Sequence, residues 1–365
     1  MLRPRPHLTG KGNVRPQRAE SVEARLRLHR NERTISFSDD EHTGMTVAIR
    51  PEDIVRYPDE GSTVELLAEC TGWDRSELTV FAGAESAVRA VFDLMIDPDD
   101  AVVCLHPSYH GYFREADAHQ AQLRAVSYAD LQLVPEAVLT AVSDDTRLVL
   151  LGNPDGLGRP LPDSLVRSVL ERLSGSGGLL VVDEAYHHFG APAMHDRIGR
   201  HPQLAVLRSF SKAWGMAGIR CGYATASADV SAMLRRVRMR NEVSGPTLAL
   251  ARWALTHPGT RDAYTAALAE GTRLVTAALR ESGFETVPTT ANFVVGRTPA
   301  GMSADEVRRR ADSAGIAIAV LPGDLVRITA APPEQAVMIA DVLRSITDGR
   351  DDEQATAQPN LIMGS

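Results

Sequence analysis

Short apolar runs alternate with helical patterns through the middle of this chain, and that alternation limits the fold more than any other feature. The apolar runs are AVVCLHP (101–107), TRLVLLGNP (146–154), GLLVVDEAY (178–186) and LAVLRSF (204–210). Amphipathic segments such as SLVRSVLERL (164–173) separate them. Buried strands that alternate with such helices build a mostly parallel sheet with helices on both faces. The sequence therefore predicts an α/β large domain.

The pattern changes near residue 245. A helical stretch over 245–283 leads into short strands at 290–297 and 325–331, each followed by a helix, which is an α+β arrangement. A chain of 365 residues also exceeds what one hydrophobic core usually serves. The expected divisions are a large α/β domain over 46–244, a smaller α+β domain over 245–347 and an N-terminal segment, 26–45, that packs with the smaller domain.

Both ends of the chain are polar and lack a sustained hydrophobic period. Residues 1–25 are rich in Pro, Arg and Gly, and residues 348–365 are polar and acidic. Segments of this kind bury too little apolar surface to offset the entropy of ordering them. We therefore expect a mobile N-terminal arm and a disordered C-terminal tail.

The overall composition is that of a soluble globular protein, with 44% hydrophobic residues and a net charge of -8. That balance gives no reason to expect nucleic acid or a membrane as a partner, and no run approaches the ~20 apolar residues that span a bilayer. The cysteines, Cys70, Cys104 and Cys221, are odd in number and far apart, as reduced intracellular thiols are. We expect a cytoplasmic protein without a metal site.

Polar side chains follow three successive predicted strands. Asn153, Asp183 and Lys212 come at intervals of about 30 residues, the length of one βαβ unit. Residues just past the carboxyl ends of neighbouring parallel strands converge on one crevice, where ligands bind. Lysine occurs at only one other position, Lys11, so a reaction that needs a lysine amine has one credible residue in this crevice.

The motifs around these positions resemble those of a known enzyme family. GNPDG (152–156) resembles the NNPTG loop, VVDEAY (181–186) the DEAY motif and RSFSKAWGMAGIRCGY (208–223) the SxSKxxxxxGxRxGY segment of fold-type I aminotransferases, which use pyridoxal 5′-phosphate (PLP). The sequence is most similar to histidinol-phosphate aminotransferases. That likeness covers most of residues 28–345 through LHRNE, RYPDEGS, FAGAES, HPSYHGY and LVRITAAPPEQ.

The resemblance implies roles for residues around the cofactor ring. Lys212 would be the Schiff-base lysine, and Asp183 would hold the proton on the pyridine nitrogen, which makes the ring an electron sink. Tyr186 and Asn153 would hydrogen-bond the ring oxygen. Tyr109 would stack on the ring.

The resemblance also implies how the phosphate and the substrate are held. The phosphate would bind Ser209, Ser211 and Arg220, with the backbone of Ala84 and Glu85 at a helix N-terminus. Tyr57 would reach the phosphate of a neighbouring subunit, which implies a homodimer. Arg327 would clamp the substrate carboxylate, and Asn31 lies in the segment that closes over it.

Three functional hypotheses fit these residues. The first is an aminotransferase that moves an amino group between an L-amino acid and a 2-oxo acid by a ping-pong route. The second is another PLP reaction of specialised metabolism, namely an amino-acid oxidase or hydroxylase, a cyclase or a decarboxylase, because motifs do not reveal which bond at Cα is cleaved. The third is a regulator that has lost catalysis, although residues 1–30 are too short for a DNA-binding domain.

The sequence departs from the family in two places. Gly152 and Asp155 replace the usual Asn and Thr of the NNPTG loop. Before the final arginine, histidinol-phosphate aminotransferases usually carry a second arginine that binds the substrate phosphate, and the matching position here is Ala319. We therefore expect an unphosphorylated amino acid as the substrate. His29, His187 and His188 are interpreted as structural or solvent-facing residues rather than catalytic ones.

Overall fold

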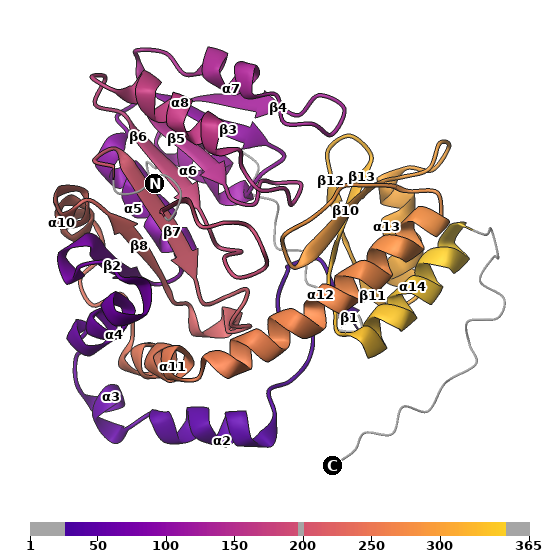
Figure 1. Cartoon of the computed structure of the whole chain (residues 1–365), viewed down its shortest axis with the longest axis horizontal. Coiled ribbons are helices and arrows are strands. Elements are labelled where there is room, and N and C mark those ends of the chain that lie inside the picture. Colours follow the sequence, from indigo (N-terminus) through magenta and orange to yellow (C-terminus); the bar gives the residue numbers. More distant parts are fainter. Residues whose placement is uncertain (1–25, 196–200, 348–365) are drawn as a thin grey trace, which may run out of the picture.

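The computed structural model describes residues 26–195 and 201–347. It has a large α/β part and a smaller α+β part, which lie side by side in Figure 1. The α/β fold class expected from the alternating pattern is confirmed. The expectations for residues 1–25 and 348–365 concern positions outside the described residues.

The large domain is built on a sheet of seven strands among the described residues, in the order β2-β8-β7-β6-β5-β3-β4. Neighbours from β4 through β7 run parallel, and β8 is antiparallel to both β7 and β2. The strands are β2 (Leu78–Phe81), β3 (Ala101–His106), β4 (Gln122–Ser127), β5 (Thr146–Gly152), β6 (Leu179–Asp183), β7 (Leu204–Ser209) and β8 (Gly222–Ala226).

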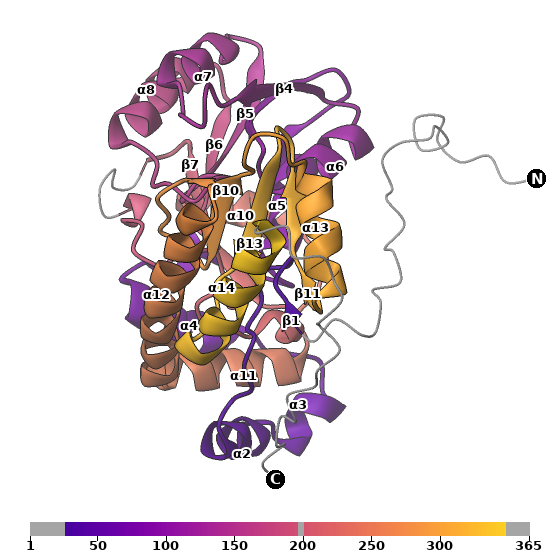
Figure 2. The same cartoon turned by 90° about the vertical axis from the view of Figure 1, so that its right-hand side faces the viewer.

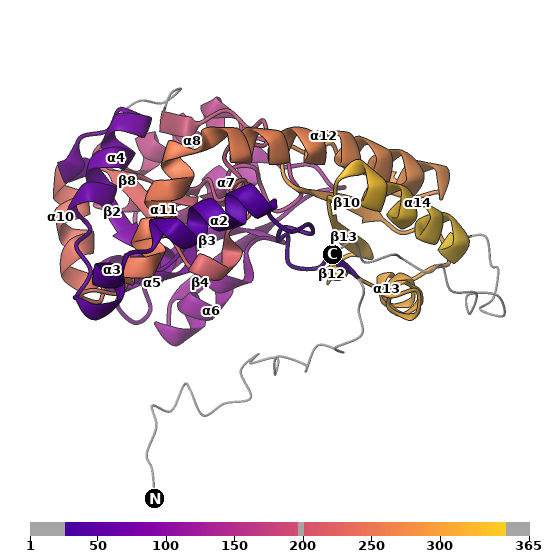
Figure 3. The same ribbon diagram turned by 90° about the horizontal axis from the view of Figure 1, so that it is seen from below.

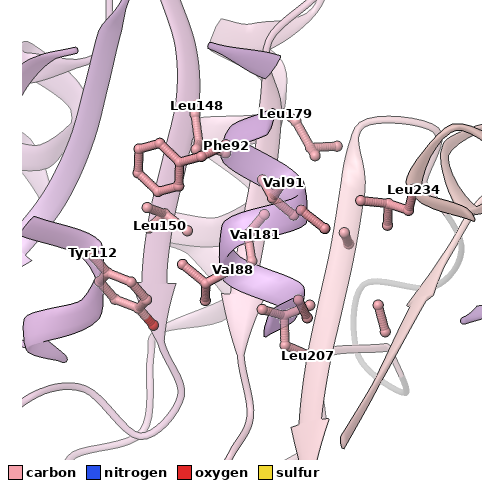
Figure 4. Close-up of a cluster of buried hydrophobic side chains, with 14 of the residues drawn as sticks. Val88, Val91, Phe92, Tyr112, Leu148, Leu150, Leu179, Val181, Leu207 and Leu234 are labelled. Atoms are coloured by element: carbon pink, nitrogen blue, oxygen red, sulfur yellow. The ribbon is translucent and has the colours of Figure 1, made fainter. Parts of the chain in front are cut away.

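Helices cover both faces of this sheet, so alternate residues of its central strands enter different cores. On one face, Leu148 and Leu150 of β5 pack with α5, α6 and α10, and Figure 4 shows this cluster. On the other face, Val149 and Leu151 pack with α7 and α8. These helices are α5 (Ala84–Met95), α6 (His110–Ala118), α7 (Pro135–Ala141), α8 (Asp163–Leu173) and α10 (Ala228–Val237).

The small domain contains an antiparallel sheet in the order β12-β13-β10-β9, backed by helices. Its elements are β9 (Glu285–Thr286), β10 (Phe293–Arg297), α13 (Ala304–Ser313), β12 (Ala319–Leu321), β13 (Leu325–Thr329) and α14 (Pro333–Thr347). Figure 2 shows α13 and α14, together with α12 (Pro258–Glu281), beside this sheet. The strands expected at 290–297 and 325–331, and the helix after each, are therefore present.

The chain enters the fold through the small domain. A short strand, β1 (Leu26–Arg27), pairs in parallel with β11 (Ile316–Ala317), and Leu28 is buried in the small-domain core. The next helices, α2 (Asp39–Ala48), α3 (Pro51–Val55) and α4 (Gly61–Thr71), lie along the large domain (Figure 1). We expect the whole of segment 26–45 to pack with the small domain. In the structure its first residues do so, and the later ones lead into α2 beside the large domain.

The domain boundary expected before residue 245 is too early. The helical stretch 245–283 is two helices, α11 (Gly245–Thr256) and α12 (Pro258–Glu281), because a proline begins the second one. Leu248 and Trp253 of α11 pack in a cluster with Leu67 of α4, so α11 belongs to the large domain. The long helix α12 then extends from the large domain to the small one (Figures 1 and 3).

Across the two described stretches of chain, no helix combines the length and apolar character needed to cross a membrane. Within the same stretches, no group of His, Cys, Asp and Glu side chains is arranged to hold a metal ion.

Candidate active site

The carboxyl ends of β5, β6 and β7 bring the predicted crevice residues together. The backbone N–H of Asn153 donates to the carbonyl of Asp183 at 2.8 Å, and that of Glu184 donates to the carbonyl of Leu207 at 2.8 Å. These bonds continue the parallel ladders beyond the strands, in which Gly152 pairs with Asp183. The loops after the three strands therefore lie next to each other, as the spacing predicted.

Lys212 lies in the turn after β7 and points toward the N-terminal segment. Its Nζ donates to the backbone carbonyls of Arg30 and Asn31, each at 3.0 Å, and lies 5.7 Å from the ring centroid of Tyr186. The N–H of Gly215 donates to the carbonyl of Lys212 at 2.9 Å and closes the turn. Gly215 has a φ of +67°, which favours glycine. The lysine amine thus lies between the two predicted partners of cofactor and substrate, Tyr186 and Asn31.

Asp183 ends β6 and faces the α5 and α6 side of the sheet. Its carboxylate is buried, with 8% of the residue exposed, and accepts hydrogen bonds from the Tyr112 hydroxyl at 2.7 Å and from the N–H of Ala185 at 2.9 Å. Burial raises the pKa of Asp183, while these two donors and the charge of Lys212 act in the opposite direction. The site therefore holds a carboxylate whose charge depends on its partners.

A cradle for an anion forms where α5 begins beside β8. Gly83 has a φ of +87°, and a Cβ there would lie 2.8 Å from Nη2 of Arg220, so the guanidinium lies against bare backbone. A Cβ at Gly222 would likewise lie 2.7 Å from the amide nitrogen of Ala84. The first N–H groups of α5 lack acceptors within the helix, so this end of the helix attracts anions.

The remaining predicted phosphate residues surround the cradle. Arg220 donates to the hydroxyl of Ser211 at 3.5 Å, and the N–H of Ser211 donates to the hydroxyl of Ser209 at 3.0 Å. The carboxylate of Glu85 lies 3.7 Å from Arg220 and accepts from Arg114 at 2.7 Å. Arg114, which sequence reasoning did not single out, thus offsets the negative charge that Glu85 brings to an anion site.

Two tyrosines flank the crevice. Tyr109 precedes α6 and is partly exposed, with its ring edge-on to Tyr112 at 5.5 Å. A Cβ at Gly111 would overlap the ring of Tyr109, so glycine there allows this rotamer. Tyr186 receives a 2.7 Å hydrogen bond on its hydroxyl from Nδ2 of Asn31. Asn31, which is buried, therefore links the N-terminal segment to the residue predicted to bind the ring oxygen.

The side-chain amide of Asn153 is bound by other groups of the protein. Its Nδ2 donates to Oε1 of Glu184 at 3.3 Å and to the carbonyl of Pro192 at 2.8 Å, and its Oδ1 accepts from the N–H of Leu161 at 3.2 Å. Both amide hydrogens are therefore used within the protein. To bind the ring oxygen as predicted, Asn153 would have to exchange one of these contacts.

Glu184, the neighbour of Asp183, forms a buried ion pair with Arg208. Glu184 is 1% exposed, and its Oε2 accepts from Nε and Nη2 of Arg208 at 3.1 and 3.0 Å. Because strand residues alternate, Asp183 and Glu184 face opposite sides of the sheet. The adjacent acids of the DEAY motif thus have separate surroundings. No sequence motif indicated that Arg208 would be the partner of Glu184.

The histidines next to the DEAY motif have lowered pKa values, so their imidazole rings are uncharged at neutral pH. Burial, followed by the charge of Arg208, lowers the pKa of His187 to about 2. Burial, followed by the charge of Arg261, lowers the pKa of His188 to about 4. Their rings pack 4.0 Å apart, which fits the structural interpretation.

Arg327 approaches the crevice from the small domain. It shares a face of β13 with Leu325, which packs in an apolar cluster with Leu131 and Leu157 of the large domain, so Arg327 also faces the large domain. Its Nη2 donates to the carbonyl of His29 at 3.1 Å. Its Nε is buried and has no hydrogen-bond partner. A half-buried guanidinium with a buried and unused donor is suited to receive an anion.

Tyr57 lies outside this group of residues. Its ring is 87% exposed in the single chain, on the loop between α3 and α4. The structure thus brings together Lys212, Asp183, Tyr186, Asn31 and the phosphate-cradle residues, but not Tyr57.

With the fold and the site described, comparison with known proteins identifies the class. Residues 58–342 match the family described as aminotransferase class I and II, and the chain belongs to that family. The histidinol-phosphate aminotransferase of Roseiflexus castenholzii is 30% identical over 307 residues, 81% of this chain and 82% of that protein. The enzyme of the same name from Symbiobacterium thermophilum is 29% identical over 357 residues, 94% of this chain and 96% of that protein.

Solved structures share the fold. The histidinol-phosphate aminotransferase of Sinorhizobium meliloti in complex with PLP superposes with a TM-score of 0.79 at 24% identity, covering 88% of this chain and 91% of that one. YbdL of Escherichia coli, described as having a methionine aminotransferase function, gives 0.77 at 21% identity and covers 87% and 93%.

These findings confirm the expectations of fold, of an aminotransferase and of PLP as its cofactor. They do not favour the oxidase, cyclase or decarboxylase alternatives.

Proposed function

We propose that this aminotransferase moves an amino group between an unphosphorylated L-amino acid and a 2-oxo acid. The observation that carries the substrate part of this proposal is the pairing of Arg327 with Ala319. Both residues lie at one level of the small-domain sheet, on the face that looks toward the large domain.

The described side chains fit PLP. When bound, the cofactor supplies an aldehyde carbon and an electron-withdrawing pyridinium ring. The cradle of Gly83, Ser209, Ser211 and Arg220 offers the phosphate a bare backbone surface, hydroxyls and a guanidinium. Asp183 would hold the proton on the ring nitrogen, and Tyr186 would donate to the ring oxygen.

Lys212 would perform the proton transfer. Only an amine can both attach the cofactor and later move the substrate's α-proton, and the Nζ of Lys212 lies between Tyr186 and the N-terminal segment. The backbone carbonyls of Arg30 and Asn31 would orient the amine when it is free. Arg327 would hold the α-carboxylate, and Asn31 would close the site beside it.

The other arginine described on this face, Arg297, is already paired with Asp130 and Glu285 at 2.9 and 2.7 Å. The lack of a second unpaired arginine beside Arg327 among the described residues argues against a phosphorylated substrate. Ala319 pairs directly with Arg327, so an arginine there would reach the same anion. A phosphate dianion without that second guanidinium would lose hydration at a cost on the order of several kcal/mol. Arg33 does not replace it readily, because its guanidinium lies over the rings of Phe37 and Tyr264 at 4.0 and 4.4 Å.

Steady-state kinetics with histidinol phosphate and a panel of free amino acids tests the substrate. We expect at least one unphosphorylated amino acid to give a higher kcat/KM than histidinol phosphate. The substitution Ala319→Arg should raise kcat/KM for histidinol phosphate by about tenfold or more, since each charge-assisted pair contributes roughly 1.5–3 kcal/mol. A wild-type preference for histidinol phosphate over every amino acid would refute the proposal and would direct attention to Arg30 or Arg33.

Replacing Arg327 by alanine should weaken amino-acid substrates by roughly 2 to 4 kcal/mol in kcat/KM, because one member of a buried charged pair is left alone. Simple amines, which lack a carboxylate, should react almost as with the wild-type enzyme. Parallel measurements with an amino acid and its decarboxylated amine separate the two cases. Equal losses for both would indicate a folding defect instead of a lost clamp.

We further propose a homodimer in which Tyr57 completes the partner's phosphate site. Large apolar side chains close to Tyr57 in the sequence stand exposed, namely Val47, Ile54 and Val55, at 74%, 70% and 77%. Several exposed apolar side chains in one short segment are typical of an interface. A soluble cytoplasmic dimer is the setting that these features support.

Mixing two inactive variants tests the shared site. Tyr57→Ala should bind PLP weakly, and Lys212→Ala should be inactive, but a mixed dimer contains one site with both residues intact. Dissociating and reassociating equal amounts should restore about a quarter of wild-type activity, because half of the dimers are mixed. No recovery, despite mixed dimers seen by native mass spectrometry, would exclude Tyr57 from the partner's site.

A further inference from the structure

Tyr112 is a buried tyrosine whose hydroxyl lies beside the predicted ring-nitrogen partner. It comes from the first turn of α6, is 1% exposed, and lies in the apolar cluster of Figure 4, where its hydroxyl oxygen is drawn in red. That hydroxyl donates to Oδ2 of Asp183 at 2.7 Å, across 71 positions of sequence.

We infer that Tyr112 is a positioning residue that fixes the carboxylate of Asp183 for the ring nitrogen of PLP. This inference rests on the proposed function, since it assumes that Asp183 meets that nitrogen. Tyr112 would act through Asp183 without touching cofactor or substrate.

The geometry makes the tyrosine necessary for a fixed orientation. Oδ1 of Asp183 accepts from the N–H of Ala185 at 2.9 Å, a group in the loop that follows the same strand. Oδ2 accepts from Tyr112, which belongs to another element. With one donor on each oxygen from different directions, the carboxylate plane cannot rotate freely. Removal of the hydroxyl would leave only the local bond.

The alternation of side chains along β6 explains why Asp183 and Tyr112 meet. Asp183 follows Leu179 and Val181 on the face of the sheet that packs against α5 and α6. Tyr112 lies on α6 within the same cluster. The aromatic ring is thus held by the core, and only its hydroxyl reaches the polar site. The rigid packing of the ring makes the position of the donor precise in space.

The charges around Asp183 indicate what the bond does. Burial and the charge of Glu184 raise the pKa of Asp183, whereas Tyr112, Ala185 and Lys212 lower it. Tyr109 also faces this carboxylate, and Cys104 faces Tyr112. Burial raises the pKa of Tyr112 itself well above its usual value, so the tyrosine remains a donor throughout the working range.

The test is Tyr112→Phe, which removes one oxygen and keeps the ring. Without the donor, the pKa of Asp183 should rise, so the carboxylate becomes protonated at a higher pH. The acid limb of kcat should move up by about one pH unit. Equilibrium dialysis with PLP should show an affinity lower by about tenfold on the acid side and closer to wild type at higher pH.

Two comparisons separate positioning from packing. Tyr264→Phe is the matched control, because the hydroxyl of Tyr264 is also buried but has no hydrogen-bond partner among the described residues. It should leave the pH profile unchanged. In an Asp183→Asn background, Tyr112→Phe should add little further loss of PLP affinity, since the two residues act as one unit.

The inference would be overturned by a Tyr112→Phe protein with an unshifted acid limb and unchanged PLP affinity, whether or not its melting temperature fell. It would also be overturned if the losses of the two variants simply added. Failure of the proposed function looks different: the wild-type protein would then bind no PLP or transfer no amino group from any amino acid.

Discussion

The Lys212→Ala variant is expected to contain no covalently attached PLP and to show no transamination above background. Lysine occurs elsewhere in the chain only at Lys11, and no other side chain supplies a flexible nucleophilic amine. Borohydride reduction followed by mass spectrometry of tryptic peptides reports the attachment. The wild-type protein should carry the cofactor on the peptide that contains Lys212.

Lys212→Arg is the control for this variant. Arginine keeps the positive charge and can donate to the carbonyls of Arg30 and Asn31, but it is not a nucleophile at working pH. It should therefore keep the fold and lose the attachment just as alanine does. Full activity in either variant would remove Lys212 from its assigned role.

The Asp183→Asn variant should still take up PLP but lose at least about 100-fold in kcat, because a neutral amide cannot hold the proton on the ring nitrogen. Steady-state kinetics and a PLP titration measure the two effects separately. Since the pKa of Asp183 is raised by burial, the wild-type rate should fall on acidification as the carboxylate takes up a proton. The variant should lack this acid limb.

Asp155→Asn serves as a second buried-carboxylate control. Asp155 is 2% exposed, and its Oδ1 accepts from the backbone N–H groups of Leu157 and Arg159 in the loop after β5. Its replacement should mainly affect the stability of that loop. If both variants lost activity to the same degree, the special role of Asp183 would not stand.

The large domain could be predicted well from the sequence because its signal is local. Strands such as Leu179–Asp183 are buried on both faces and read as continuous apolar runs, and polar residues mark where they end. Parallel strands bring their carboxyl ends to one edge of the sheet, so the residues that follow these strands lie close together. The neighbourhood of Asn153, Asp183 and Lys212 followed from spacing alone.

The domain boundary could not be predicted because it depends on which domain each of the helices α11 and α12 packs against. Residues 245–283 form helices as expected, and their composition gives no sign that α11 packs on α4 while α12 continues into the small domain. Pro258 was a visible signal for the break between them. The partner of each helix is a tertiary property.

Partners of the site residues were also beyond sequence reasoning. The amide of Asn153 is bound by Glu184 and Pro192, and Asp183 is bound by Tyr112, across 31, 39 and 71 positions of sequence. Motif positions identify residue types, but hydrogen bonds over such separations depend on side-chain rotamers in the finished core. The same holds for the bonds from Arg208 to Glu184, which no sequence pattern predicted.

The pairing of β1 with β11 has a consequence for the order in which the active site can be made. Leu26 pairs with Ile316, and the N–H of Asn31 donates to Thr329, 298 positions away. During synthesis, residues 26–31 can therefore bind their partners only after residues 316–329 have left the ribosome. The large domain can build its sheet much earlier. The predicted Schiff-base lysine is thus covered late, by residues that follow β1, the first strand among the described residues.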